Sequence, residues 1–118
     1  MNDTSNQAGD ISVQVTQTDS EAIVQIAGRV TIDSSPHLRL VLLRLLGHKT
    51  DAVVVIDLSK VSYLDTSGIA TLLEAVKAAR ERSVKLRLFG ASGRVRMLAE
   101  LLALPKIFDA LGSEVVFT

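Results

Sequence analysis

Hydrophobic and polar residues alternate with a period of two over several short stretches of the chain. The alternation predicts a half-exposed strand at residues 11–17 and a second strand at 22–27, paired with the first as a hairpin. A third strand is predicted at 52–58, where the unbroken apolar run Val53–Ile56 is typical of a strand buried on both faces. Further strands are predicted at 84–89 and 114–117.

Between these strands, hydrophobic residues recur at the three- and four-residue intervals of amphipathic helices. The first predicted helix has Pro36 in its first turn, where the fixed φ of proline suits a helix, and it ends at Gly47. Ser35 is the predicted N-cap, with Asp33 and Ser34 as alternatives. The other predicted helical segments are 67–82, 93–103 and 106–111.

The order of these elements defines an α/β fold class. Strands and helices alternate from residue 52 onward, which implies parallel strands joined by right-handed helical crossovers. We therefore expect one small mixed β-sheet of about four to five strands, covered by about four helices. Residues 1–10 are polar and are predicted to form a disordered N-terminal tail, so that a single domain occupies residues 11–118.

The composition narrows the class of protein. Of 118 residues, 47% are hydrophobic and only 3% are aromatic, so the core must be aliphatic. The 13 basic and 13 acidic residues cancel, which argues against nucleic acid as a partner. With no cysteine and only two histidines, we expect no metal or other cofactor. The chain shows no signal-peptide pattern and no segment suited to membrane insertion, which predicts a cytoplasmic protein.

The chemically distinctive stretch is Asp65-Thr66-Ser67-Gly68, between the central predicted strand and the second predicted helix. It places a carboxylate and two hydroxyls at a helix N-terminus, where the first amides lack intrahelical acceptors and the helix dipole is positive. A phosphoryl group carried by one of these hydroxyls would meet free N–H donors. On this pattern alone, Ser67 fits either a modification site or an ordinary helix cap.

The apolar strand, the Asp-Thr-Ser-Gly motif and the small-residue helix after it resemble the signature of STAS domains. Within that family they most resemble the bacterial anti-sigma factor antagonists. The resemblance extends from about Ile11 to Phe117, and the position of the motif near the middle of the chain supports it. Ile69-Ala70 departs from the Leu-Gly that is commoner in the antagonists. The resemblance implies a STAS domain, a small mixed sheet with helices packed on it.

The resemblance also implies roles for individual residues. Ser67 occupies the place of the serine that is phosphorylated in anti-sigma factor antagonists, and Thr66 is the competing acceptor. Asp65 could cap the helix, orient Ser67 or contact a kinase. Asp33 matches an acidic position near the phosphorylation site, or it caps a helix. The residues implied in partner binding are Asp65, Thr66, Ser67, Gly68, Ile69 and Asp33.

The function implied by the resemblance is partner switching. The unphosphorylated protein, a monomer when free, would bind an anti-sigma factor that is a serine kinase of the GHKL type, and so release a sigma factor. The kinase would phosphorylate Ser67, and a PP2C-type phosphatase would reverse the reaction. Two alternatives are a STAS subunit of a lipid-transport ABC ATPase complex and a nucleotide-sensing STAS module.

An enzymatic function is not supported by the motifs. Ser67, His37 and Asp57 are the residue types of a catalytic triad, but the serine does not lie in a Gly-x-Ser-x-Gly elbow. The stretch Gly90-Ala91-Ser92-Gly93-Arg94 lacks the spacing of a phosphate-binding loop. We therefore predict a binding protein that is not an enzyme.

Overall fold

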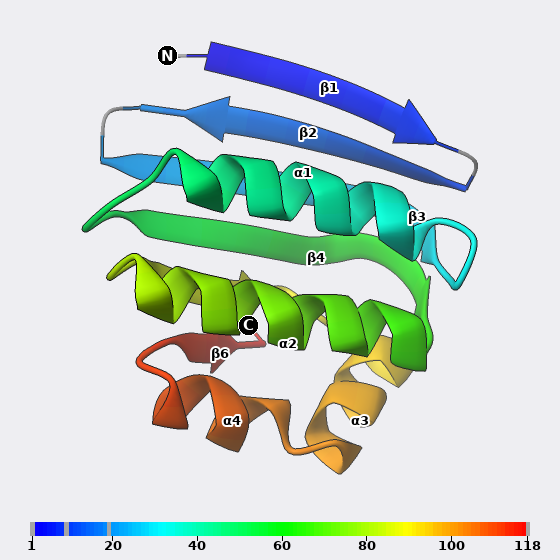
Figure 1. Ribbon diagram of the computed structural model, residues 1–118. Helices are drawn as coiled ribbons and strands as arrows, with labels where there is room; N and C mark the ends of the chain where they lie inside the picture. Colours follow the sequence, from blue (N-terminus) through cyan, green and yellow to red (C-terminus); the bar gives the residue numbers. More distant parts are fainter. Residues whose placement is uncertain (1, 9, 19, 118) are drawn as a thin grey trace.

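A computed structural model describes residues 2–8, 10–18 and 20–117 of the chain (Figure 1). Residues 1, 9, 19 and 118, which belong to the predicted tail and domain, lie outside the described residues. The strands are β1 (Asn2–Ala8), β2 (Ile11–Gln17), β3 (Glu21–Val30), β4 (Val53–Leu64), β5 (Lys85–Phe89) and β6 (Glu114–Val116). The helices are α1 (Ser35–Gly47), α2 (Thr66–Glu81), α3 (Gly93–Leu101) and α4 (Leu104–Ala110).

Within the described residues, the six strands form one sheet whose order follows the chain, from β1 to β6. β1, β2 and β3 pair antiparallel, whereas the pairs from β3 to β6 are parallel. The predicted α/β class, the hairpin of β2 with β3 and the parallel pairing after residue 52 are therefore confirmed.

The N-terminal segment differs from the sequence prediction. Instead of a disordered tail over 1–10, the structure has strand β1, in which Asn2 lies opposite Gln17 and Ala8 lies opposite Ile11. An edge strand of this kind is held by backbone N–H and C=O groups, so its polar composition does not prevent pairing. The predicted four to five strands correspond to β2–β6, and β1 adds a sixth.

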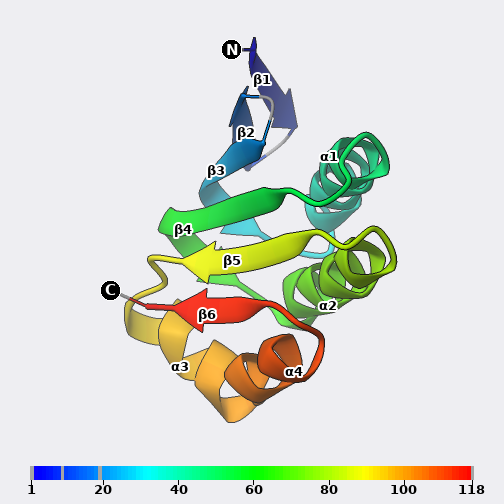
Figure 2. The same cartoon turned by 90° about the vertical axis from the view of Figure 1, so that its left-hand side faces the viewer.

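The two long helices cover one face of the sheet, as Figure 2 shows. Val54 and Ile56 of β4 point toward them and are fully buried, whereas Val53 and Val55 point to the other face and are only half-buried. The prediction that this strand is buried on both faces was therefore wrong. The reason is that α3 packs near the end of β4 and α4 lies along β6, so neither helix covers the second face.

Strand β4 also continues further than the predicted turn after Leu58. It runs through Ser59 and Lys60 to Leu64, and its pairing with β3 is interrupted by register shifts near Gly28. This extension carries the chain directly to the start of α2, which begins one residue earlier than predicted. Across 2–8, 10–18 and 20–117, no helix has both the length and the apolar character needed to cross a lipid bilayer.

Candidate functional site

Asp65 is the residue around which the start of α2 is organised. Its Oδ1 atom accepts hydrogen bonds from the amide of Ser67 at 2.9 Å and from the amide of Gly68 at 3.2 Å. The Ser67 hydroxyl also donates to Oδ1. Asp65 is therefore the N-cap of α2, and Ser67 occupies the second position of the helix.

This geometry corrects the expectation of free N–H donors at the motif. The amides of Ser67 and Gly68 are already bound by Asp65, so a phosphoryl group on Ser67 could not use them without displacing the carboxylate. Burial opposes ionisation of Asp65, but the hydrogen bonds from the Ser67 hydroxyl and from the amides of Gly68, Ser67 and Ile32 outweigh it and hold its pKa below the usual value. A negative charge is thus fixed beside the Ser67 hydroxyl.

The second carboxylate oxygen joins α2 to the loop between β3 and α1. Asp65 Oδ2 accepts a hydrogen bond from the Ile32 amide at 3.2 Å. The next residue, Asp33, is exposed, and its amide donates to Thr31 Oγ1. The structure therefore brings the loop that carries Asp33 to the start of α2, although the two segments are far apart in the sequence.

The start of α1 differs by one residue from the prediction. Ser34, which was predicted as an alternative to Ser35, is the N-cap residue, and its side chain makes no bond to the helix. Its Oγ atom instead donates to the carbonyl of Arg29 at 2.8 Å and accepts from the amide of Thr31 at 2.9 Å. Ser34 thus fixes the shape of the loop that meets Asp65.

Two residues of the predicted contact set lie in the interior. Ile69 is 4% exposed and belongs to the hydrophobic core. Gly68 is buried, and a Cβ atom there would overlap Leu64 and come within 2.9 Å of Val30 Cγ1. Both were expected to contact a partner, but Gly68 lies against Val30 of β3 and Leu64 of β4, and Ile69 is part of the core. Thr66 is exposed and Ser67 is half-buried, so these two remain accessible.

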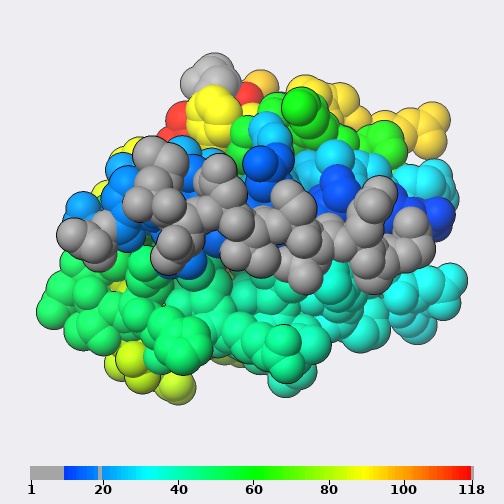
Figure 3. All heavy atoms as spheres, turned by 90° about the horizontal axis from the view of Figure 1, so that it is seen from above, coloured from blue at the N-terminus to red at the C-terminus, as the bar shows by residue number. Residues whose placement is uncertain are grey.

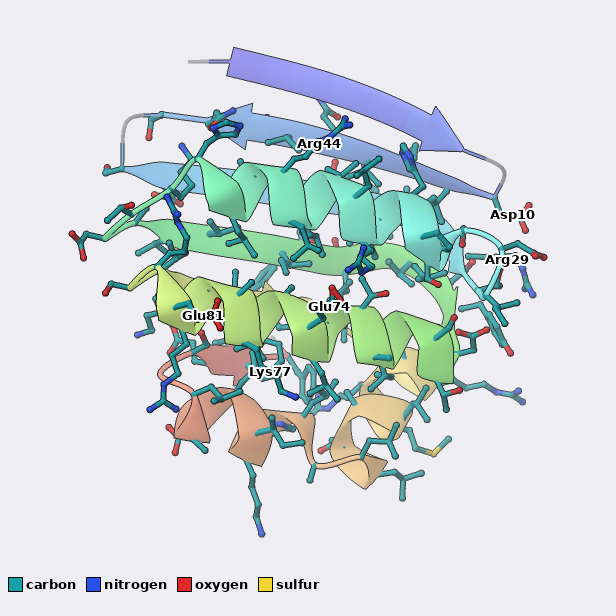
Figure 4. All side chains as sticks on the ribbon, in the orientation of Figure 1. Asp10, Arg29, Arg44, Glu74, Lys77 and Glu81 are labelled. Carbon is teal, nitrogen blue, oxygen red and sulfur yellow. The ribbon has the colours of Figure 1, made fainter. Side chains whose placement is uncertain are left out.

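The sequence analysis missed the apolar side chains that surround this site. Ile32 and Leu101 are 73% and 74% exposed, and Tyr63 and Met97 are also exposed. The guanidinium of Arg29, at the same end of the sheet in Figure 4, lies 4.4 Å from the centre of the Tyr63 ring. A hollow of about 230 Å³ between β4 and α3 is lined by Tyr63, Met97 and Leu101 among others. We call Tyr63, Met97 and Leu101 the apolar patch.

The residues that could have formed a catalytic triad are separated. Asp57 accepts hydrogen bonds from the Ser59 amide at 2.8 Å and from Gln25 Nε2 at 3.4 Å, which gives it a structural role in β4. In the part of the chain that the structure describes, no hydrogen bond joins Ser67 to His37 or to Asp57. The geometry of the motif is that of a capped helix start with an accessible hydroxyl.

One mixed sheet with two long helices on one face, and a serine at the capped start of the second of these helices, together describe a single α/β domain with an accessible hydroxyl beside its central strand. Residues 12–116 match the STAS domain family, and the chain belongs to this family. It is 32% identical over 100 residues to the anti-sigma-B factor antagonist of Listeria monocytogenes, an alignment that covers 84% of this chain and 87% of that protein. Its homology to anti-sigma factor antagonists confirms the predicted family and supports a role outside catalysis.

Two further similarities bear on the fold and on the alternative functions. The crystal structure of an anti-sigma factor antagonist from Mycobacterium paratuberculosis superimposes with a TM-score of 0.73, at 23% identity, over 92% of this chain and 86% of that chain. The intermembrane phospholipid transport system binding protein MlaB of Escherichia coli is 40% identical over 53 residues, which cover 45% of this chain and 55% of that protein.

Proposed function

We propose that this protein is an anti-sigma factor antagonist that acts by partner switching. The unphosphorylated form would bind an anti-sigma factor of the GHKL kinase type in the cytoplasm and so release a sigma factor. The kinase would use ATP and Mg²⁺ to phosphorylate Ser67, and a PP2C-type phosphatase would restore the binding form. The observation that carries the proposal is the half-buried Ser67 hydroxyl at the capped start of α2, beside the exposed apolar patch.

Phosphorylation of Ser67 would change the surface charge more than the fold. The phosphate adds about −1.5 to −2 charges at neutral pH. It would lie beside the Asp65 carboxylate, and the Ser67 oxygen could no longer donate to that carboxylate. Repulsion between charges a few ångströms apart is about 1–4 kcal/mol between the dielectric constants of water and of a protein surface. The helix dipole offsets part of this energy, so we expect the domain to stay folded and the partner to dissociate.

The apolar patch would supply most of the affinity for the partner. Contiguous exposed apolar side chains mark protein interaction sites, and aromatic residues, Met and Arg are enriched in interface cores. Tyr63, Met97 and the Arg29 guanidinium have this character, and they lie near the end of β4 that leads to Ser67. In this proposal the apolar patch supplies the binding energy, and the negative charge of a phosphate on Ser67 weakens the contact enough to release the partner.

A second candidate function is constitutive contact with an ATPase of a lipid-transport complex. The observation that favours it is the 40% identity to MlaB over 53 residues. In that case the start of α2 would hold the partner without being phosphorylated. The remaining alternative, a nucleotide-sensing role, is tested by direct titration with GTP or ATP.

The phosphorylation experiment uses the purified protein with anti-sigma factor kinases from its own organism, ATP and Mg²⁺. Intact-mass spectrometry should show one added phosphoryl group in the wild type and in Thr66→Ala, but none in Ser67→Ala. Thr66 is the matched control because its hydroxyl is exposed and adjacent in the sequence. Phosphorylation of Ser67→Ala but not of Thr66→Ala would assign the acceptor to Thr66 and overturn the role of Ser67.

The binding experiment measures the affinity of the same kinases for Ser67→Asp by calorimetry. We expect the substitution to weaken binding strongly, while Ser83→Asp leaves it unchanged. Ser83 is exposed just beyond the other end of α2, so it controls for the added charge. If Ser67→Asp retains the wild-type partner, and above all if that partner is a transport ATPase, the second candidate replaces the first.

A further inference from the structure

A separate hollow lies between α1 and β2. It is a partly open hollow with a volume of about 370 Å³, which falls in the range of about 300–1,000 Å³ that is usual for small-molecule sites. Val15 and Gln17 of β2 form one wall, and one side of α1 forms the other. In Figure 3 the atoms of α1 form a continuous green band along one side of the molecule. We call this hollow the α1 groove.

One end of the α1 groove is suited to an anionic group. Arg44 and His48 both line it and are one helical turn apart, so they can approach the same ligand group. Figure 4 shows Arg44 on the side of α1 that faces β2. Among the described residues, Arg44 has no acidic partner, whereas Arg39 of the same helix pairs with Glu74 at 2.7 Å. A free guanidinium can bind a carboxylate through two parallel hydrogen bonds.

The middle of the groove is apolar, and its other end carries an unsatisfied polar atom. Leu40, Val41 and Leu45 line the groove together with Val15. His37 lies seven residues before Arg44, which corresponds to about 10 Å along the helix. Its Nε2 atom is buried and, within the part of the chain that the structure describes, has no hydrogen-bond partner. Buried polar atoms of this kind are usually satisfied, so a missing partner points to a ligand group.

We propose that the α1 groove binds an acyl amphiphile with a carboxylate head. The carboxylate would bind Arg44 and His48, and the acyl chain would lie along Leu40, Val41 and Leu45. A hydroxyl or carbonyl at the far end of the chain would satisfy His37 Nε2. An alternative role for Arg44 and His48 is to stabilise the negative end of the α1 helix dipole. That role explains neither the hollow nor the buried His37 Nε2 atom, which has no hydrogen-bond partner among the described residues. The proposal does not depend on partner switching.

The test is a calorimetric titration of the purified chain with decanoate and 10-hydroxydecanoate below their micelle concentrations, and with 1-decanol below its solubility limit. We expect saturable one-to-one binding of both carboxylates, tighter binding of the hydroxylated one, and binding of the alcohol that is at least about tenfold weaker. Absence of saturable binding, or equal affinity for decanoate and decanol, would overturn the proposal. Equal affinity for decanoate and decanol would show that the groove binds the apolar chain without recognising the carboxylate, as expected of a groove for an apolar peptide segment.

Three variants locate the ligand. Arg44→Gln should weaken decanoate binding about tenfold, while Arg39→Gln, which removes an equal charge from the same helix, should change it less than about twofold. His37→Phe should keep decanoate binding and abolish the preference for 10-hydroxydecanoate. Circular dichroism establishes that each variant is folded. A folded Arg44→Gln protein with unchanged affinity, or a His37→Phe protein that retains the preference, would place the ligand elsewhere and refute the assignment.

Discussion

The carboxylate of Asp65 binds the backbone of Ile32 through one oxygen and the start of α2 through the other. Oδ2 accepts from the Ile32 amide at 3.2 Å, while Oδ1 accepts from the Ser67 and Gly68 amides. One side chain therefore fixes the distance between the loop that carries Asp33 and the helix that carries Ser67. A modification that weakens this carboxylate's contacts acts on both segments at once.

Replacing Asp65 by Asn should lower stability in a pH-dependent way. Asn is as good an N-cap as Asp, but its amide has one acceptor atom, so the bond to Ile32 or the bonds to α2 are lost. The pKa of Asp65 is lower in the folded protein than its usual value. Its contribution is therefore fully present above the unfolded-state pKa and is lost as the pH falls through the folded-state pKa. We expect Asp65→Asn to cost about 1 kcal/mol at neutral pH.

The measurement is urea unfolding of both proteins at neutral pH and at about pH 3. The difference in unfolding free energy between wild type and Asp65→Asn should shrink as the solution is acidified. The pKa of Asp57 is also lowered, because hydrogen bonds from Ser59 and Gln25 outweigh its burial. Asp57 therefore also loses stabilising interactions in acid, but it does so equally in both proteins, and its effect cancels in the difference between their unfolding free energies. A difference that stays constant with pH would show that the charge of Asp65 is not involved.

Two neighbouring serines at the start of α1 should differ in their effect on stability. Ser34 is 3% exposed and bonds both the Arg29 carbonyl and the Thr31 amide. Ser34→Ala leaves these backbone groups without a partner, which should cost about 1–3 kcal/mol. No side-chain hydrogen bond of Ser35 is found among the described residues, so Ser35→Ala should change the unfolding free energy by less than about 0.5 kcal/mol. Equal effects in thermal unfolding would argue against the role of Ser34.

Gly68 of α2 and Gly47 of α1 should respond to alanine in opposite directions. A Cβ atom at position 68 would overlap Leu64 and approach Val30, so Gly68→Ala should destabilise the domain by about 1–3 kcal/mol. Gly47 has no atom within 4 Å of an added Cβ, so Gly47→Ala should stabilise it by about 0.5–1 kcal/mol. Urea unfolding of the two variants compares them directly. A stable Gly68→Ala protein would mean that α2 can shift away from β4.

Periodicity was sufficient to predict most of the architecture but not the extent of its strands. Val54 and Ile56 identified the central strand, and the Asp-Thr-Ser-Gly motif located the start of α2 to within one residue. The continuation of β4 was missed because Ser59 and Lys60 interrupt the apolar pattern. The exposure of Val55 depends on which faces the helices cover, and local sequence does not encode that.

The candidate site was predictable only where its residues are adjacent in the sequence. The link between Asp65 and Ile32 joins positions 33 residues apart, and it depends on β3 and β4 ending at the same edge of the sheet. The apolar patch combines Tyr63 of β4 with Met97 and Leu101 of α3, which come from two separate segments of the chain. Met97 and Leu101 also fit the spacing of a core-facing helix stripe, so their exposure appears only once α3 is placed.

The apolar patch yields a prediction that separates binding from stability. Leu101 is 74% exposed, so Leu101→Ser should change the unfolding free energy by less than about 0.5 kcal/mol. If the patch is the contact surface of the anti-sigma factor, the same substitution should weaken kinase binding by about tenfold, since an apolar interface side chain contributes on the order of 1–2 kcal/mol. Ile23→Thr is the matched control, because Ile23 is exposed on the open face of the sheet. Calorimetry that finds equal losses for the two variants would move the contact surface away from α3.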